Sequence, residues 1–137
     1  MVKKTIKKIM NNIFYIAIYP FNIMISFDES DAQMKKACKI LKVIPGDDEI
    51  FNFNKVKTKF HGRSIIFEGC KIILRLNFIP DFKDPDQIGL LQHEIFHVCH
   101  FIMSDIDTPL TSSTSEPYAY FIQYLTSIIF AFLNENN

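Results

Sequence analysis

The order of hydrophobic and polar residues in the first third of the chain predicts a strand followed by a helix. Residues 13–27 are largely apolar, and residues 21–27 alternate in the manner of a half-buried strand. The polar residues 28–31 suit a helix start, and the turn-forming residues 45–48 end the helix. Between them, apolar side chains recur at helical spacing, with lysines on the opposite face. These apolar positions are Met34, Ala37, Cys38 and Leu41.

The middle of the chain predicts a β-hairpin. Residues 49–62 follow no regular pattern. Residues 64–67 and 71–78 are rich in isoleucine, leucine and phenylalanine, and the short segment 68–70 connects them. We expect residues 71–78 to form an edge strand, with which an extended peptide could pair through its backbone.

Two helices are predicted in the last part of the chain. The first begins with Asp84 as its N-cap and Gln87 at the capping-box position, and it extends to about residue 104. Its core-facing stripe consists of Ile88, Leu91, Ile95, Val98 and Ile102. The second helix covers residues 116–133, with Ser115 as its N-cap. This helix is apolar nearly all round, which predicts burial on more than one side or a partner that covers it.

These elements together predict an α+β fold, in which a small antiparallel or mixed sheet packs against the helix at 85–104 and a closing C-terminal helix. A length of 137 residues suits a single domain over residues 1–137. A composition of 48% hydrophobic and 22% charged residues is typical of a folded globular chain. We expect the basic N-terminal segment, residues 1–11, to be flexible.

Charge and cysteine content exclude several classes of function. The formal net charge is zero, so the chain has no basic field that would attract nucleic acid. The apolar run at 13–27 is too short to span a bilayer and lacks a signal-peptidase site, so we expect neither a membrane location nor secretion. Three cysteines without a CxxC spacing favour a reducing compartment over a disulfide framework. Among them, we interpret Cys99 as a small buried hydrophobic residue.

The sequence His93-Glu94-Ile95-Phe96-His97 is an HExxH motif inside the first of the two C-terminal helices. Residues four apart on a helix project from one face, about 6 Å apart along the axis. The two imidazoles can therefore hold one metal ion, and Zn²⁺ is the expected cofactor. Glu94 lies where a general base can take a proton from water on that metal.

Two histidines hold zinc poorly, and a catalytic site usually has three protein ligands. We expect the third ligand to come from the next element of the chain. Glu116 is the strongest candidate, because it lies 19 residues after His97 at the start of the following helix. Asp105 and Asp107 are weaker candidates, since loop carboxylates are more often caps or solvated groups.

Other polar residues are candidates for supporting roles, either bonding to a metal ligand or stabilising the transition state. His100 lies about 10 Å along the helix from His93, too far to share a metal with both other histidines, so we expect it to support the site or to pack. His61 is either a surface histidine or a donor that reaches the site from the sheet side. Tyr118 and Tyr120, at the start of the last helix, are further candidate donors.

The spacing of the motif and Glu116 resembles that of the thermolysin-like zincins, in which a glutamate on the next helix completes a His-His-Glu site. The order of elements over residues 12–133, together with the segment 115–120 (Ser-Glu-Pro-Tyr-Ala-Tyr), resembles small HExxH proteins encoded by bacteriophages. The resemblance implies a minimal zincin-like, gluzincin-type domain. One position departs from it: where the peptidases carry an aspartate that orients a ligand histidine, this chain has Tyr120.

The motif and the resemblance favour a zinc-dependent metallopeptidase that acts on a peptide or protein substrate. One alternative is a structural component of a phage virion, such as a neck, portal-ring or decoration protein, which would have phage proteins or further copies of itself as partners. A second alternative is a protein that binds a host factor. These hypotheses place the protein in the host cytoplasm or in the virion.

Overall fold

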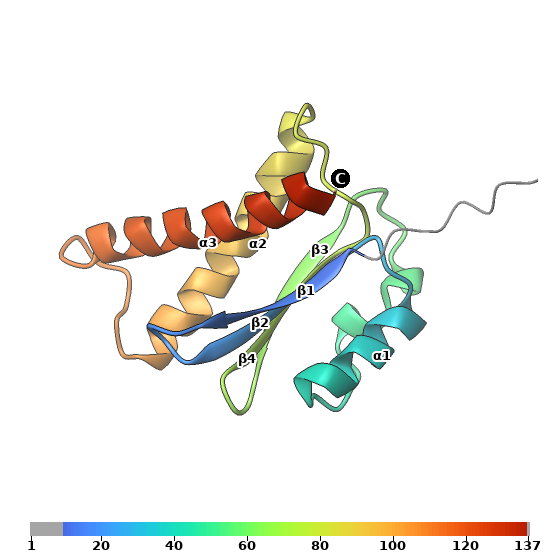
Figure 1. Cartoon of the computed structure of the whole chain (residues 1–137), viewed down its shortest axis with the longest axis horizontal. Coiled ribbons are helices and arrows are strands. Elements are labelled where there is room, and N and C mark those ends of the chain that lie inside the picture. Colours follow the sequence, from blue (N-terminus) through green and yellow to red (C-terminus); the bar gives the residue numbers. More distant parts are fainter. Residues whose placement is uncertain (1–9, 137) are drawn as a thin grey trace, which may run out of the picture.

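The computed structural model describes residues 10–136, which form an α+β fold with a four-stranded mixed sheet between two layers of helices (Figure 1). The predicted fold class is confirmed. The strands are β1 (Asn11–Ile16), β2 (Phe21–Phe27), β3 (Gly62–Phe67) and β4 (Lys71–Leu76). The helices are α1 (Asp31–Leu41), the short 3-10 helices η1 (Glu49–Phe51) and η2 (Phe53–Lys55), α2 (Pro85–Asp105) and α3 (Ser115–Asn136).

The sheet has the order β1-β2-β4-β3, and this order corrects one expectation from the sequence. β2 and β4 are parallel, whereas β1 pairs antiparallel with β2 and β3 antiparallel with β4. The expectation that residues 71–78 form an edge strand is wrong, because β4 is paired on both sides. Its residues from 72 to 76 are all buried, as in a strand covered on both faces. The free edge on that side of the sheet belongs to β3.

β1 is a strand that the sequence pattern does not predict. It pairs with β2 from Asn11 opposite Ser26 to Ile16 opposite Phe21. The side chains from residue 13 to 20 are mostly apolar without a clear alternation, so the segment has no period of two. Of the segment 1–11, Asn11 belongs to β1 and Met10 is buried. The expectation of flexibility for residues 1–9 concerns residues outside the described part of the chain.

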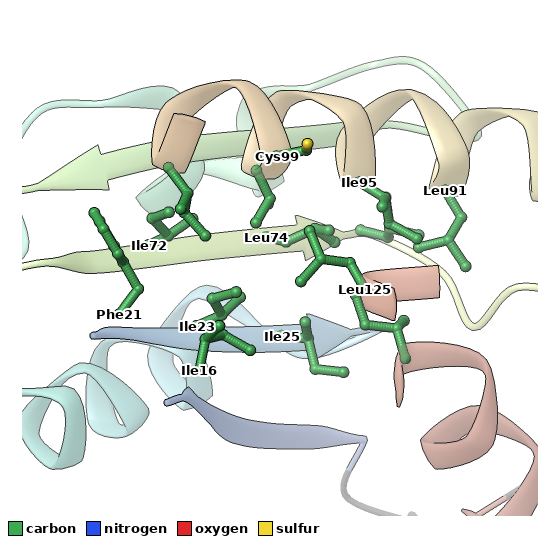
Figure 2. Packing of buried hydrophobic residues seen from close by; sticks show 14 of the residues in the cluster. Ile16, Phe21, Ile23, Ile25, Ile72, Leu74, Leu91, Ile95, Cys99 and Leu125 are labelled. Carbon is green, nitrogen blue, oxygen red and sulfur yellow. The ribbon is translucent and has the colours of Figure 1, made fainter. Parts of the chain in front are cut away.

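The two faces of the sheet are covered by different helices. α2 lies over β3 and β4, and α3 lies beside α2. α3 also reaches β1, because the ring of Phe132 contacts that of Phe14 edge to face with the centroids 6.1 Å apart. Figure 2 shows the buried side chains of this layer between α2, α3 and the sheet. α1, η1 and η2 pack on the opposite face, against alternate strand residues such as Met24 and Ile73.

Arg75 ties the smaller helical layer to the sheet. It is 1% exposed, forms an ion pair with Asp31 at 2.8 Å, and donates to the carbonyl oxygens of Ile50 at 2.6 Å and Glu29 at 2.9 Å. Its guanidinium also lies over the ring of Phe53, 4.1 Å from the centroid. The start of α1 and both short helices are thereby fixed relative to β4.

α2 begins and ends close to its predicted bounds. Asp84 caps it by accepting hydrogen bonds from the backbone N–H groups of Asp86 and Gln87. The Gln87 side chain donates to Asp84 Oδ2 and accepts from the backbone N–H of Asp81, which ties the preceding loop to the helix. The 21 residues of α2 carry the HExxH motif in their middle, away from both ends of the helix.

α3 is buried along one face against the rest of the fold. Its buried residues are Tyr118, Phe121, Leu125, Ile129 and Leu133. Tyr120 and Tyr124, on the neighbouring face, are exposed. Ser115 is the first residue of the helix rather than its N-cap, and its hydroxyl donates to the carbonyl of Ser112. None of the helices between residues 10 and 136 combines the length and apolar character that crossing a membrane requires.

Candidate metal site

The HExxH motif brings two imidazoles together on one face of α2, where His93 is exposed and His97 is half-buried. The Nε2 atoms of His93 and His97 lie 3.0 Å apart, and the rings meet edge to face with their centroids 4.7 Å apart. One carboxylate oxygen of Glu94 and a nitrogen of each histidine all lie within 4.8 Å of one another. The four-residue spacing is sufficient to produce this convergence, because it needs only an unbroken helix.

The geometry of the two nitrogens fits a shared metal ion. Zinc–nitrogen bonds of about 2.0–2.1 Å at the tetrahedral angle place two ligand nitrogens about 3.4 Å apart. The observed separation of 3.0 Å is close to that value, so a small rotation of either ring would admit an ion. Imidazole nitrogens with a neighbouring carboxylate are a donor set that suits zinc. His93, Glu94 and His97 therefore form a candidate metal-binding cluster.

Glu94 is held beneath the two histidines by the edge strand. Its side chain is buried, and Ser64 Oγ donates a 2.6 Å hydrogen bond to its Oε2. Gly62 allows this close approach of β3 to α2. A Cβ atom at Gly62 would lie 3.0 Å from Glu94 Cγ and 2.6 Å from Leu76 Cδ2. The position of the carboxylate thus depends on two small residues of β3.

Neither Ser64 nor Gly62 was singled out from the sequence. The only available signal is that β3 begins with small residues at alternate positions, 62 and 64, which point to the same face of the sheet. Small residues on one face of a strand indicate that another element lies close to it. That signal does not identify α2 as the element.

An open cavity of about 410 Å³ lies in front of the cluster. Its walls come from α2, from β3 with the residue before it, and from η1. The lining residues are Glu49, His61, Gly62, Arg63, Ser64, His93, Glu94, His97 and Phe101. The cavity therefore opens along the free edge of the sheet, and a ligand in it would contact both histidines.

His61 lies on the cavity wall opposite the HExxH helix. Its Nε2 contacts Oε1 of Glu49. Its ring meets Phe53 edge to face at 5.0 Å, and its backbone N–H donates to Asn77 Oδ1 at 2.7 Å. Two locations were considered for His61, the open surface and the sheet side of the site, and the structure places it on the sheet side. Its role as a donor in a reaction stays a prediction.

Glu49 is a cavity residue that sequence reasoning missed. It stands in a segment without regular periodicity, 44 residues before His93. It reaches the site because η1 packs against β3, and because Arg75 fixes the neighbouring Ile50. No local pattern carries information about such a contact.

Glu116, Tyr118 and Tyr120 do not line this cavity, because α3 lies beside α2 on the side away from the free edge of β3. Glu116 is exposed in the first turn of α3 and is not a member of the histidine cluster. Tyr120 is also exposed, at 67%. The assignment of Glu116 as the third ligand stays a prediction.

His100 and Tyr118 contact each other and do not line the cavity. The Tyr118 hydroxyl lies 3.5 Å from His100 Nδ1, and the ring of His100 is parallel to that of Phe96. Burial raises the pKa of the Tyr118 hydroxyl above its ordinary value. Cys99 is fully buried, and this burial raises the pKa of its thiol to about 12, as suits a packing residue.

The fold and the site together define an α+β protein with a candidate metal-binding His-Glu-His cluster on a helix. Comparisons of the chain with protein-family models, with curated proteins and with solved structures give no match. The residues of the site are therefore the basis for a functional assignment.

Proposed function

We propose that the protein is a zinc-dependent hydrolase of the minimal zincin type, acting on peptide bonds, in which His93 and His97 hold the metal. The observation that carries this proposal is the convergence of two imidazole nitrogens at 3.0 Å beside the buried carboxylate of Glu94. A bound Zn²⁺ would lower the pKa of a coordinated water and polarise the carbonyl of a substrate.

Glu94 supplies the general base of this reaction. The oxygen of water forms a bond to the carbonyl carbon while its proton passes to the Glu94 carboxylate. The same proton then moves to the amide nitrogen as the C–N bond breaks, which leaves a carboxylic acid and an amine. The hydrogen bond from Ser64 fixes one oxygen of Glu94, so the other oxygen is oriented for the proton transfer.

The edge strand β3 provides a means of holding an extended substrate. One side of β3 pairs with β4, and its other side is the free edge of the sheet beside the cavity. An extended peptide that adds to this edge would place its backbone over His93 and His97. Main-chain hydrogen bonds of this kind favour unfolded or loop segments over compact proteins.

Metal content and turnover test the proposal together. We expect purified full-length protein to contain about one equivalent of zinc, and His93→Ala and His97→Ala to lose it. Glu94→Gln should keep the metal but lose hydrolysis of a peptide mixture, followed by mass spectrometry of new termini. Glu68→Gln, at the exposed β3–β4 turn, is the matched control and should retain both properties. Hydrolysis that persists in Glu94→Gln would remove the catalytic assignment.

An exposed apolar patch favours a role in protein assembly, such as that of a structural component of a phage virion, as the second candidate function. Ile18, Tyr120 and Tyr124 are 76%, 67% and 42% exposed and surround a shallow hollow with Tyr19 and Phe121. Aromatic residues at such exposure are typical of protein–protein contacts. Sedimentation analysis separates the two functions: a stable ring or larger assembly without zinc supports the structural role, and a zinc-containing monomer supports the hydrolase.

A further inference from the structure

We infer that the third protein ligand of the metal is the carboxylate of Glu49, which His61 orients, rather than that of Glu116. This inference rests on the proposed metal-binding function of His93 and His97. It assigns a role to a residue pair on the opposite wall of the cavity, formed by Glu49 and His61 and called here the Glu49–His61 pair.

Two side chains outside α2 offer metal-binding donors to the cavity that His93 and His97 line. A zinc site with an open position for water needs three protein ligands, and α2 supplies two of them. Apart from α2, the cavity is lined by two side chains that commonly bind metals, Glu49 and His61. The hydroxyl of Ser64 is already bonded to Glu94. Glu116 lies on α3, which is not part of the cavity wall.

The backbone at Glu49 is held in place, whereas its side chain is half-exposed. Asp48 caps η1 by accepting from the backbone N–H of Ile50, and Arg63 holds Asp48 through two hydrogen bonds of 3.1 and 2.8 Å. Ile50 is fully buried. The side chain of Glu49, in contrast, is 49% exposed. Its carboxylate lies outside the 4.8 Å cluster but lines the same cavity, so the inference requires rotation of this half-exposed side chain toward the two histidines.

The buried Nε2 atom of His61 contacts Oε1 of Glu49, so the imidazole lies where it can orient this carboxylate. If one oxygen of Glu49 binds the metal, His61 can donate to the other oxygen. Such a hydrogen bond from outside the ligand set orients a metal-binding carboxylate and raises affinity.

The test is a Zn²⁺ titration of metal-stripped full-length protein in competition with a chromogenic chelator. We expect Glu49→Gln, which preserves the size of the side chain, to weaken zinc binding by about 100-fold. His61→Ala should weaken it by about tenfold, the scale for partners that only orient a ligand. Glu116→Gln and the surface control Glu68→Gln should bind zinc as the wild type does. Circular dichroism of each metal-free variant checks that the fold is retained.

The outcomes separate this inference from the proposed function. Loss of zinc in His93→Ala and His97→Ala, with wild-type affinity in Glu49→Gln, overturns the inference and leaves the metal site intact. Loss in Glu116→Gln with no change in Glu49→Gln assigns the third ligand to α3 instead. A wild-type chain that binds no zinc removes the proposed function itself. Should Glu49→Gln unfold, Glu49→Asp retains the charge with a shorter reach, and wild-type affinity in it also overturns the inference.

Discussion

The hydroxyl of Ser64 on the edge strand donates a 2.6 Å hydrogen bond to Oε2 of Glu94, which lies 30 residues later in the middle of α2. Ser64 is 8% exposed and Glu94 is 4% exposed, so the two groups meet in a largely buried position at the wall of the cavity. A buried carboxylate that loses its donor pays most of the cost of its desolvation. The hydrogen bond therefore both positions the candidate base and stabilises the contact between β3 and α2.

Replacing Ser64 with alanine should destabilise the protein by about 1–3 kcal/mol, because Glu94 is left buried without this donor. Urea denaturation measures the change in the free energy of unfolding. Ser64→Thr keeps the hydroxyl, so its free energy of unfolding should fall less than that of Ser64→Ala. Combining Ser64→Ala with Glu94→Gln in a double-mutant cycle isolates the part of the interaction energy that depends on the carboxylate charge, because glutamine still accepts a hydrogen bond. A cycle in which the two changes are simply additive would mean that this charge does not strengthen the hydrogen bond.

Gly62 and Gly89 offer a matched pair of glycine substitutions. Gly62→Ala places a Cβ atom 2.6 Å from Leu76 Cδ2 and 3.0 Å from Glu94 Cγ, so we expect a loss of about 1–3 kcal/mol. Gly89 lies inside α2 with open space around its Cα, and Gly89→Ala should stabilise the protein by about 0.5–1 kcal/mol. Thermal unfolding of both variants checks the opposite signs. Equal melting temperatures would contradict the close approach of β3 to α2.

The parts of the fold that follow from local spacing are predictable from the sequence. Asp84 caps α2 through N–H groups two and three residues away, and His93 and His97 converge because one helical turn separates them. The core stripe of α2 depends on the same helical period. These features need no knowledge of any other element.

The parts that depend on contacts between distant segments are not predictable in this way. β4 was expected at the edge of the sheet, but β2 pairs with it because the chain crosses over through α1 and inserts β4 between β2 and β3. Glu49 meets His61 because η1 packs on β3. Such pairings are decided by how the buried surfaces fit together, and a one-dimensional pattern of apolar residues does not specify them.

Binding of Zn²⁺ should raise the stability of the folded chain. Free zinc at 100 times its dissociation constant would add about 2.7 kcal/mol to the free energy of unfolding, which corresponds to a rise of about 10 °C in Tm. His93→Ala and His97→Ala should show no rise. Mg²⁺, which prefers oxygen ligands, serves as the control cation and should leave Tm unchanged. An equal zinc-dependent shift in the two histidine variants would place the metal elsewhere in the chain.

The ion pair between Arg75 and Asp31 predicts a loss of stability in acid. Burial alone would raise the pKa of Asp31. Hydrogen bonds from Arg75 and from the backbone N–H groups of Asn54 and Phe53 outweigh this and hold the pKa below its ordinary value of 3.8. A carboxyl group with a lowered folded-state pKa stabilises the protein above its unfolded-state pKa. That contribution should be complete near neutral pH and decline as the pH falls below about 4.

Asp31→Asn isolates this effect. Near neutral pH the variant should be less stable than the wild type by about 3 kcal/mol, because Arg75 is left buried without its ionic partner. The difference in the free energy of unfolding should shrink between pH 4 and pH 2, as the wild type loses the same charge. Urea denaturation of both proteins across this range measures the difference, with Asp47→Asn in an exposed turn as the control. A difference that stays constant with pH would show that Asp31 acts through its backbone contacts and not through its charge.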